Sequence, residues 1–286
     1  MASQLEESIT FACQECGKTI RLPAYYSGRV GDCPECHSYV DVPRESDESA
    51  IGGREADLPK YAGVAARTNA QLWLEVSAVL CLAYVPWLWR TIGSIGVTRP
   101  ATDRTVYGLI YLFIDALQVS LPLLAIIALS GDRWSLFGIV RPKWGTDVII
   151  GCVIWFGCYI CRWYVISLLP AAVLKMPHPP RVAHHLGAQG ILPCALMFVI
   201  CVVNSSAQEL VFRGYLIPRF ERLLRSTWLA VLVTAVLFGS FHLYQGVAAT
   251  ILITAGAVVY GAAFCVLRRL WPLCVAHTLN NFMLWL

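Results

Sequence analysis

Long apolar stretches are the feature of this sequence that most limits what it can fold into. A helix needs about 20 apolar residues to cross the hydrocarbon core of a bilayer. The stretches close to that length are 71–89, 106–129, 147–170, 190–212, 227–244, 247–267 and 271–286. Because 57% of the 286 residues are hydrophobic and only 14% are charged, a soluble globular domain is excluded. We therefore expect an all-α polytopic membrane protein in contact with the lipid bilayer, with about seven to eight transmembrane helices.

The eighth helix of that estimate depends on one segment. The amphipathic sequence IPRFERLLR at 217–225 follows the fourth stretch and could either continue its helix or form a separate one.

Four of the twelve cysteines lie in two CxxC pairs near the N-terminus. Cys13 and Cys16 form the first pair and Cys33 and Cys36 the second, with sixteen residues between them. Each pair brings two thiolates to one side of a turn, so two pairs complete the tetrahedral shell that zinc prefers. A segment of about forty residues has too little apolar surface to fold alone, so the metal would supply the missing stability. The sequence predicts a structural Zn²⁺ site, and residues 11–43 resemble the short zinc ribbons at the N-termini of many bacterial proteins.

Composition divides the chain into three parts. We expect a zinc ribbon at 1–43, a flexible linker at 44–68 and a transmembrane helical domain at 69–286. The linker is polar and rich in small residues, and it has no helical or alternating periodicity. The ribbon is expected to dock a cytoplasmic partner rather than to catalyse a reaction, because a shell of four thiolates leaves no open position on the metal.

Charge distribution predicts the orientation in the membrane. If the seven stretches all cross, one side carries the N-terminus and the larger share of basic residues. These are Arg67, Arg133, Arg141, Lys143, Arg219, Arg222, Arg225, Arg268 and Arg269. The positive-inside rule places this side in the cytoplasm, where reduced metal-binding cysteines are also expected. The start of the chain does not have the pattern of a cleavable signal peptide. We expect an integral protein of the bacterial inner membrane, and the net charge of +4 is too dispersed for a nucleic-acid partner.

Polar residues inside three of the apolar stretches are the main functional signal. Ionisable groups at membrane depth are costly and mark functional sites by default. They occur here in pairs spaced by four residues, which places each pair on one face of its helix. The pairs are Glu209 with Arg213, Phe238 with His242, and His277 with Asn281. If the three faces meet, they bring together a carboxylate, two imidazoles, an amide and a guanidinium, which is the inventory of a hydrolytic site.

Charged residues also occur in or near the earlier stretches, and for these a structural role is expected. They are Glu75, Asp115, Asp147 and Arg162. Positions at helix ends and snorkelling toward the interface explain most such groups. Asp115 and Arg162 are expected to pair across the second and third stretches.

The three motifs resemble those of the CPBP intramembrane proteases, a family that includes the CAAX prenyl endopeptidases of the Rce1 type. The family pattern is EExxxR, then FxxxH, then HxxxN, on successive helices. The counterparts here are Gln208-Glu209-Leu-Val-Phe-Arg213, Phe238-Gly-Ser-Phe-His242 and His277-Thr-Leu-Asn280-Asn281. Order and spacing match, and the resemblance places the protease-like core at about 105–286.

The resemblance implies an endopeptidase that cleaves a peptide or protein substrate at the membrane with an activated water. In the family, the first glutamate and the FxxxH histidine are thought to hold and activate this water, while the last histidine and asparagine stabilise the oxyanion. Carried over, His242 contacts the water, and His277 and Asn281 donate to the oxyanion. Arg213 is expected to pair with Glu209.

Gln208 departs from the family pattern, which has a glutamate at this position. A carboxamide cannot take a proton at neutral pH, and Glu209 is turned about 100° away along the helix. Three interpretations follow: Glu209 acts as base after a helix rotation, His242 acts as base while Gln208 orients the water, or the protein is an inactive membrane scaffold that keeps the cavity. The alternative to catalysis for Glu209 and Arg213 is a buried ion pair that only fixes their helix. The HExxH motif of soluble zinc proteases is absent, and the sequence leaves a catalytic metal undetermined.

Overall fold

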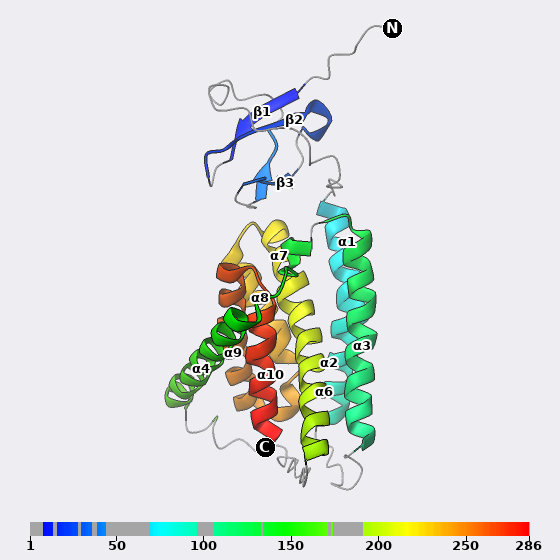
Figure 1. Cartoon of the computed structure of the whole chain (residues 1–286), viewed down its shortest axis with the longest axis vertical. Helices are drawn as coiled ribbons and strands as arrows, with labels where there is room; N and C mark the ends of the chain where they lie inside the picture. The colour runs from blue at the N-terminus through cyan, green and yellow to red at the C-terminus, as the bar shows by residue number, and fades with distance from the viewer. Residues whose placement is uncertain are drawn as a thin grey trace. The chain divides into compact units, whose positions relative to one another are not determined.

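The computed structural model describes residues 8–13, 16–27, 30–35, 39–43, 69–95, 106–132, 134–170, 173 and 191–285. The predicted ligand Cys36 and the predicted linker 44–68 lie outside these residues. The chain divides into two compact units, Met1–Leu74 with Ala128–Asp132, and Glu75–Ile127 with Arg133–Leu286. Figure 1 shows small strands in the first unit and a bundle of helices in the second.

The first unit holds two antiparallel hairpins. Strand β1 (Ser8–Ala12) pairs with β2 (Thr19–Pro23), and β3 (Val30–Asp32) pairs with β4 (Tyr39–Asp41). A single 3-10 turn, η1 (Ala24–Tyr26), follows β2. Every second residue of a strand points to the same face, so the apolar residues of β1 and β2 gather on one side. Among the described residues, the buried apolar side chains of the hairpin region form one cluster: Ile9, Phe11, Cys13, Ile20, Leu22, Cys33, Val40 and Val42.

The second unit is a helix bundle. Helix α1 (Asn69–Val79) continues through the π-helical segment η3 (Leu80–Tyr84) into α2 (Val85–Ser94). Helices α3 (Val106–Leu129) and α4 (Trp144–Leu168) follow, joined through η5 (Trp134–Phe137). Helix α6 (Ile191–Glu209) continues through a second π-helical segment, η6 (Leu210–Leu216), into α7 (Ile217–Leu224). The remaining elements are α8 (Thr227–Ser240), η7 (Leu243–Gln245), α9 (Val247–Leu267) and α10 (Trp271–Trp285).

The expected all-α membrane architecture is confirmed, with differences in where helices end. Among the described residues, five helices are long and apolar enough to cross a membrane: Asn69–Ser94, Ile110–Leu129, Trp144–Leu168, Cys194–Leu224 and Val247–Leu267. Helix α8 has 14 residues and α10 has 15, fewer than the roughly 20 that a crossing requires. The segment 217–225 adds no separate eighth helix, because α7 continues α6 through η6.

The predicted stretch 227–244 is too long. Helix α8 ends at Ser240, and the backbone N–H of His242 donates to the Gly239 carbonyl in a tighter turn. Phe238 and His242 therefore do not share one helical face, although they lie close together.

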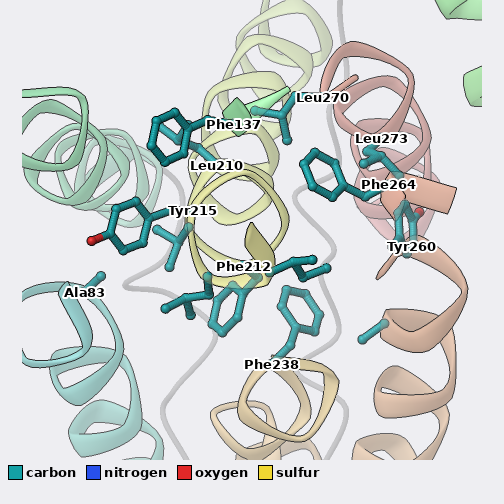
Figure 2. Close-up of a cluster of buried hydrophobic side chains, with 14 of the residues drawn as sticks. Ala83, Phe137, Leu210, Phe212, Tyr215, Phe238, Tyr260, Phe264, Leu270 and Leu273 are labelled. Atoms are coloured by element: carbon teal, nitrogen blue, oxygen red, sulfur yellow. The ribbon is translucent and has the colours of Figure 1, made fainter. Parts of the chain in front are cut away.

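The bundle core gathers around η6. Helix α10 lies against α4 and α6, and α8 lies against α9 and α7. Figure 2 shows Phe212 of η6 beside Phe238 of α8, with Phe264 and Leu273 contributed by α9 and α10. Phe212 is fully buried and meets Phe238 edge to face, with ring centroids 5.2 Å apart.

The connection between α3 and α4 is built into this core rather than lying over it. Phe137 is fully buried and stacks on Tyr215, with ring centroids 6.0 Å apart. The Leu270 N–H donates to the Gly138 carbonyl at 3.0 Å. Gly138 has a φ of 70°, and a Cβ there would come within 2.7 Å of the Phe264 ring, so only glycine fits this approach. The connection therefore packs against η6, α9 and the residue before α10.

The three carboxylates for which a structural role was expected are bonded to arginines, and Asp147 lies in the first turn of α4, at a helix end as predicted. Glu75 pairs with Arg219 at 3.0 Å, and Asp147 pairs with Arg269 at 2.8 Å. Asp147 is fully buried, and both of its carboxylate oxygens accept hydrogen bonds from Arg269. The backbone N–H of Lys143 also donates to Oδ2, at 2.6 Å. These pairs tie α4 to the start of α10 and α7 to α1.

Asp115 is the third of these carboxylates, and its predicted partner was Arg162. That prediction is wrong: Asp115 pairs with Arg90 at 2.6 Å and accepts a hydrogen bond from Trp87 Nε1 at 2.8 Å. Arg162 is exposed on α4. The bonds to α2 satisfy the Asp115 carboxylate without any contribution from α4.

Candidate active site

A buried carboxylate connects two of the three predicted motifs. Glu209 is fully buried at the end of α6, and its Oε1 accepts from Arg213 Nη1 at 3.0 Å and from His277 Nδ1 at 2.7 Å. Its Oε2 is buried and has no hydrogen-bond partner among the described residues. The predicted Glu209–Arg213 pair is present. The hydrogen bond between Glu209 and His277 connects this pair to the third motif, which contains His277.

The Arg213 guanidinium is buried beside two aromatic rings. Arg213 is 2% exposed, and its Nη2 donates to the Ala257 carbonyl at 3.3 Å. The guanidinium carbon lies 4.5 Å from the Phe238 ring centroid and 5.3 Å from that of Tyr260. Cation–π contacts of this kind stabilise a desolvated charge. The same two rings flank His277, at centroid distances of 5.7 and 5.8 Å.

His242 lies next to the Phe238 ring, in the turn that follows α8. The two ring centroids are 5.0 Å apart, and His242 Nδ1 lies 2.9 Å from the Phe238 carbonyl oxygen. A carbonyl oxygen can only accept, so Nδ1 carries the proton in this contact. In the neutral imidazole, Nε2 then holds the lone pair. The turn thus fixes the tautomer that has a basic nitrogen at Nε2.

Two amide side chains complete the set. Gln208 Nε2 donates to Asn204 Oδ1 at 2.9 Å, while Gln208 Oε1 is buried with no partner among the described residues. Asn281 Nδ2 donates to the Ser205 hydroxyl oxygen at 3.0 Å. The two amides therefore contact two adjacent residues of α6: Gln208 contacts Asn204, and Asn281 of α10 contacts Ser205.

Sequence reasoning missed Asn204, Ser205 and Tyr260. Asn204 and Ser205 stand four residues before Gln208 and Glu209, so each lies on the helical face of the residue that follows it by one turn. This spacing was a signal that could have found them. Tyr260, on an otherwise apolar helix, has no such signal in the sequence.

The N-terminal unit contains a second cluster, made of thiols. The Sγ atoms of Cys13, Cys16 and Cys33 lie within 4.8 Å of one another, and those of Cys16 and Cys33 are 3.6 Å apart. Two thiolates on tetrahedral zinc, with Zn–S distances of about 2.3 Å, are separated by about 3.8 Å. The three thiols could hold a metal ion, and the Cys16–Cys33 distance is close to that between two zinc ligands. The fourth predicted ligand, Cys36, lies outside the described residues.

Residues 190–283 match the model of a protein family described as type II CAAX prenyl endopeptidase Rce1-like. This region is Rce1-like. The match spans α6 to α10 and contains all three motifs, so the family resemblance is confirmed over these residues. Residues 105–189, which we expected to belong to the protease-like core, precede it. Comparisons with curated proteins and with solved structures returned no match.

The family that residues 190–283 match is one of endopeptidases. The five long apolar helices make the chain an integral membrane protein. A peptide substrate and a lipid bilayer fit both findings.

Proposed function

We propose that the protein is an intramembrane endopeptidase that hydrolyses a peptide bond with a water activated at His242. The observation that carries this proposal is the buried group of Glu209, Arg213 and His277, arranged around the same Phe238 ring that contacts His242. Structural ion pairs elsewhere in the bundle have no imidazole partner among the described residues, which sets this group apart.

His242 is the general base of the proposed mechanism. Its Nε2 holds the lone pair when Nδ1 donates to the Phe238 carbonyl. Glu209 is less suited to this task, because its Oε1 already accepts from Arg213 and His277. Turning Glu209 into the position of Gln208 would need a rotation of about 100° and would break both bonds. Of the three interpretations of Gln208, we favour the one in which it orients the water.

His277 and Asn281 are the proposed oxyanion donors. For His277 to donate through Nε2 while Nδ1 donates to Glu209, the ring must carry both protons. The Glu209 carboxylate, 2.7 Å from Nδ1, would stabilise that charge. Asn281 would use the second hydrogen of the Nδ2 group that already donates to Ser205. Donors fixed in this way stabilise charge as it develops.

The proposed reaction is balanced without another reactant. The water oxygen attacks the carbonyl carbon of the substrate, and one water proton passes to His242 Nε2. The oxyanion forms beside His277 and Asn281. The C–N bond then breaks, and the proton on His242 moves to the leaving amine, which restores the neutral imidazole.

For the N-terminal unit we propose a structural zinc ion held by Cys13, Cys16, Cys33 and Cys36. Zinc would supply stability rather than chemistry there, because four thiolates leave no open coordination position. We also propose that the ribbon faces the cytoplasm of a bacterial cell and recruits a partner protein at the inner membrane. The excess of basic residues on that side supports this orientation.

A proteolysis assay tests the function. Purified protein in detergent or liposomes is offered a library of membrane peptides, and cleavage by wild type is compared with cleavage by His242→Ala. We expect cleavage by wild type and a loss of about 100- to 10,000-fold in His242→Ala, as for removal of a general base. Leu243→Ala is the matched control, because Leu243 is the exposed neighbour of His242. Robust cleavage by His242→Ala would contradict the proposal.

The second candidate function is that of an inactive membrane scaffold, and Gln208 is the observation that favours it. If wild type and a folded Gln208→Glu variant both fail to cleave any peptide, the scaffold interpretation replaces the protease. In that case an added carboxylate beside Glu209 would only destabilise the helix.

A further inference from the structure

The candidate site contains several buried polar atoms without a hydrogen-bond partner among the described residues, and one of them belongs to Gln208. Gln208 Oε1 is buried and has no hydrogen-bond partner among the described residues, although Nε2 of the same side chain is bonded to Asn204. An unpaired buried acceptor costs on the order of 1–3 kcal/mol. Such an atom in a folded protein calls for an explanation, and a water or substrate atom is a common one.

The bond to Asn204 leaves the accepting end of the Gln208 amide without a partner among the described residues. A carboxamide, unlike a carboxylate, has one donating and one accepting end, and rotation by 180° exchanges them. Asn204 Oδ1 can only accept, so at 2.9 Å it binds the NH2 group of Gln208. The accepting Oε1 is thereby turned away from Asn204 and remains available.

The neighbouring residue of α6 uses the same arrangement. The Ser205 hydroxyl oxygen accepts from Asn281 Nδ2 at 3.0 Å and is itself fully buried. Two consecutive residues of α6 therefore bind the amides of Gln208 and Asn281, each through its NH2 group. Only Asn204 does so with an oxygen that cannot donate, because the Ser205 hydroxyl can both donate and accept.

We propose that Asn204 is a positioning residue that holds Gln208 with Oε1 as the hydrogen-bond acceptor for the attacking water. The water then donates one hydrogen to Gln208 Oε1 and the other to His242 Nε2, and its oxygen lone pair remains free for attack on the carbonyl carbon. A glutamate at position 208 would present two equivalent oxygens and would not need this help. A glutamine does need the bond to Asn204, because rotation of its amide by 180° would present the NH2 group, a donor, to the water. This inference rests on the proposed function.

A double-mutant cycle in the proteolysis assay tests the proposal. Asn204→Leu is close to isosteric and removes the acceptor. We expect it to lower kcat about tenfold with little change in KM, since one oriented hydrogen bond in the transition state is lost. Asn204→Asp keeps an accepting oxygen in place and is expected to retain most of the activity. In a Gln208→Glu background, Asn204→Leu should change kcat by less than about twofold, because either carboxylate oxygen can accept.

The pH profile separates positioning from a general loss of structure. Gln208→Glu should add an acid limb to kcat/KM, since protonation of its carboxyl replaces one accepting oxygen with a donating O–H, and this limb should persist in the Asn204→Leu, Gln208→Glu double variant. If Asn204→Leu does not fold, Asn204→Ala removes the same acceptor with less bulk.

The outcomes distinguish the two claims. An equal loss of kcat in both backgrounds would overturn the role of Asn204 and leave the protease assignment standing. Cleavage that survives His242→Ala, or no cleavage by folded wild type, would overturn the proposed function and this inference with it.

Discussion

The N-terminal unit buries eight side chains between two short hairpins, whereas the main cluster of the helical unit, counted over the described residues, buries 28. Two of the eight are cysteines whose thiols lie in the candidate metal cluster. Domains below about 40 residues have too little core for stability, and metals commonly make up the difference. The ribbon is therefore expected to depend on an added ion, and the bundle on its own packing.

The polar groups within the bundle show a related difference. Both oxygens of Asp147 and of Glu221 are bonded, the latter by Arg268 at 2.7 and 2.8 Å. Glu209 and Gln208 each keep one buried oxygen without a partner among the described residues. The bonded carboxylates of Asp147 and Glu221 hold helices together, whereas the unpaired oxygens of Glu209 and Gln208 lie in the candidate site, where a ligand could bond to them.

Metal removal is predicted to have the largest effect, and only in the ribbon. Structural zinc contributes about 10–16 kcal/mol of apparent binding free energy in small zinc domains. We expect one zinc per chain, and loss of protease resistance of the ribbon after chelation or in Cys33→Ser. Cys81→Ser, an exposed cysteine of the bundle, is the control. Absence of stoichiometric metal in the full chain would refute the dependence of the ribbon on zinc. A fall in the melting temperature of the bundle would refute the claim that metal removal affects only the ribbon.

Arg269→Leu is predicted to have the next largest effect, confined to the stability of the bundle. It leaves the Asp147 carboxylate buried without its arginine, which costs on the order of 3–5 kcal/mol. Thermal unfolding in detergent measures the loss, and Arg162→Leu, on the exposed surface of α4, serves as control. Zinc content should not change. A loss equal to that of the control would show that the pair adds nothing to the bundle.

Asn281→Leu should change activity rather than stability. Removing one oxyanion donor typically lowers kcat about 100- to 1,000-fold. We expect such a loss with nearly unchanged KM and melting temperature, measured by cleavage kinetics and thermal unfolding. Asn280→Leu changes the adjacent half-buried residue and should keep most of the activity. Equal losses in the two variants would remove Asn281 from the site.

The smallest effect is expected at the surface of the ribbon. Lys18 Nζ donates to Glu35 Oε2 at 2.7 Å, and this hydrogen bond, with the negative charge of Glu35, raises the pKa of Lys18. Any contribution to stability is present at neutral pH and is lost as the pH rises through that pKa. Because the pair is exposed to solvent, Glu35→Gln should lower the pKa of Lys18, observed by NMR titration, without a measurable change in melting temperature. Unfolding of the ribbon by this variant would show that its fold depends on surface charge.

Helices were the part of the fold most open to prediction, because a run of about 20 apolar residues specifies both structure and environment. Their ends were less predictable. Hydropathy continues through Phe241, Leu243 and Tyr244, so the stretch 227–244 predicts one helix, although the backbone turns after Ser240. Apolar residues indicate burial, and they carry no information on the hydrogen bonds that end a helix.

Parts of the site followed from local spacing and parts did not. Glu209 and Arg213 are four residues apart on one helix, so their contact could be predicted. The contact of Glu209 with His277 joins residues 68 apart and depended on recognising the motifs together. The pairs of Glu75 with Arg219 and of Asp147 with Arg269 have no local pattern, because only the packing of distant helices brings them together.

The π-helical segment Leu210–Leu216 has a consequence for how this chain can change in length. Its wider turns accommodate an extra residue without breaking the rod, as an absorbed insertion would. Glu209 before the segment and Arg219 after it therefore belong to two rotational registers of one continuous helix. Deleting one residue between 210 and 216 would remove the absorbed residue and return the segment to α-helical turns, with Glu209 and Arg219 keeping their orientations toward His277 and Glu75. Among changes in chain length within the helix, a deletion in this segment is therefore the one that the flanking ion pairs should tolerate best.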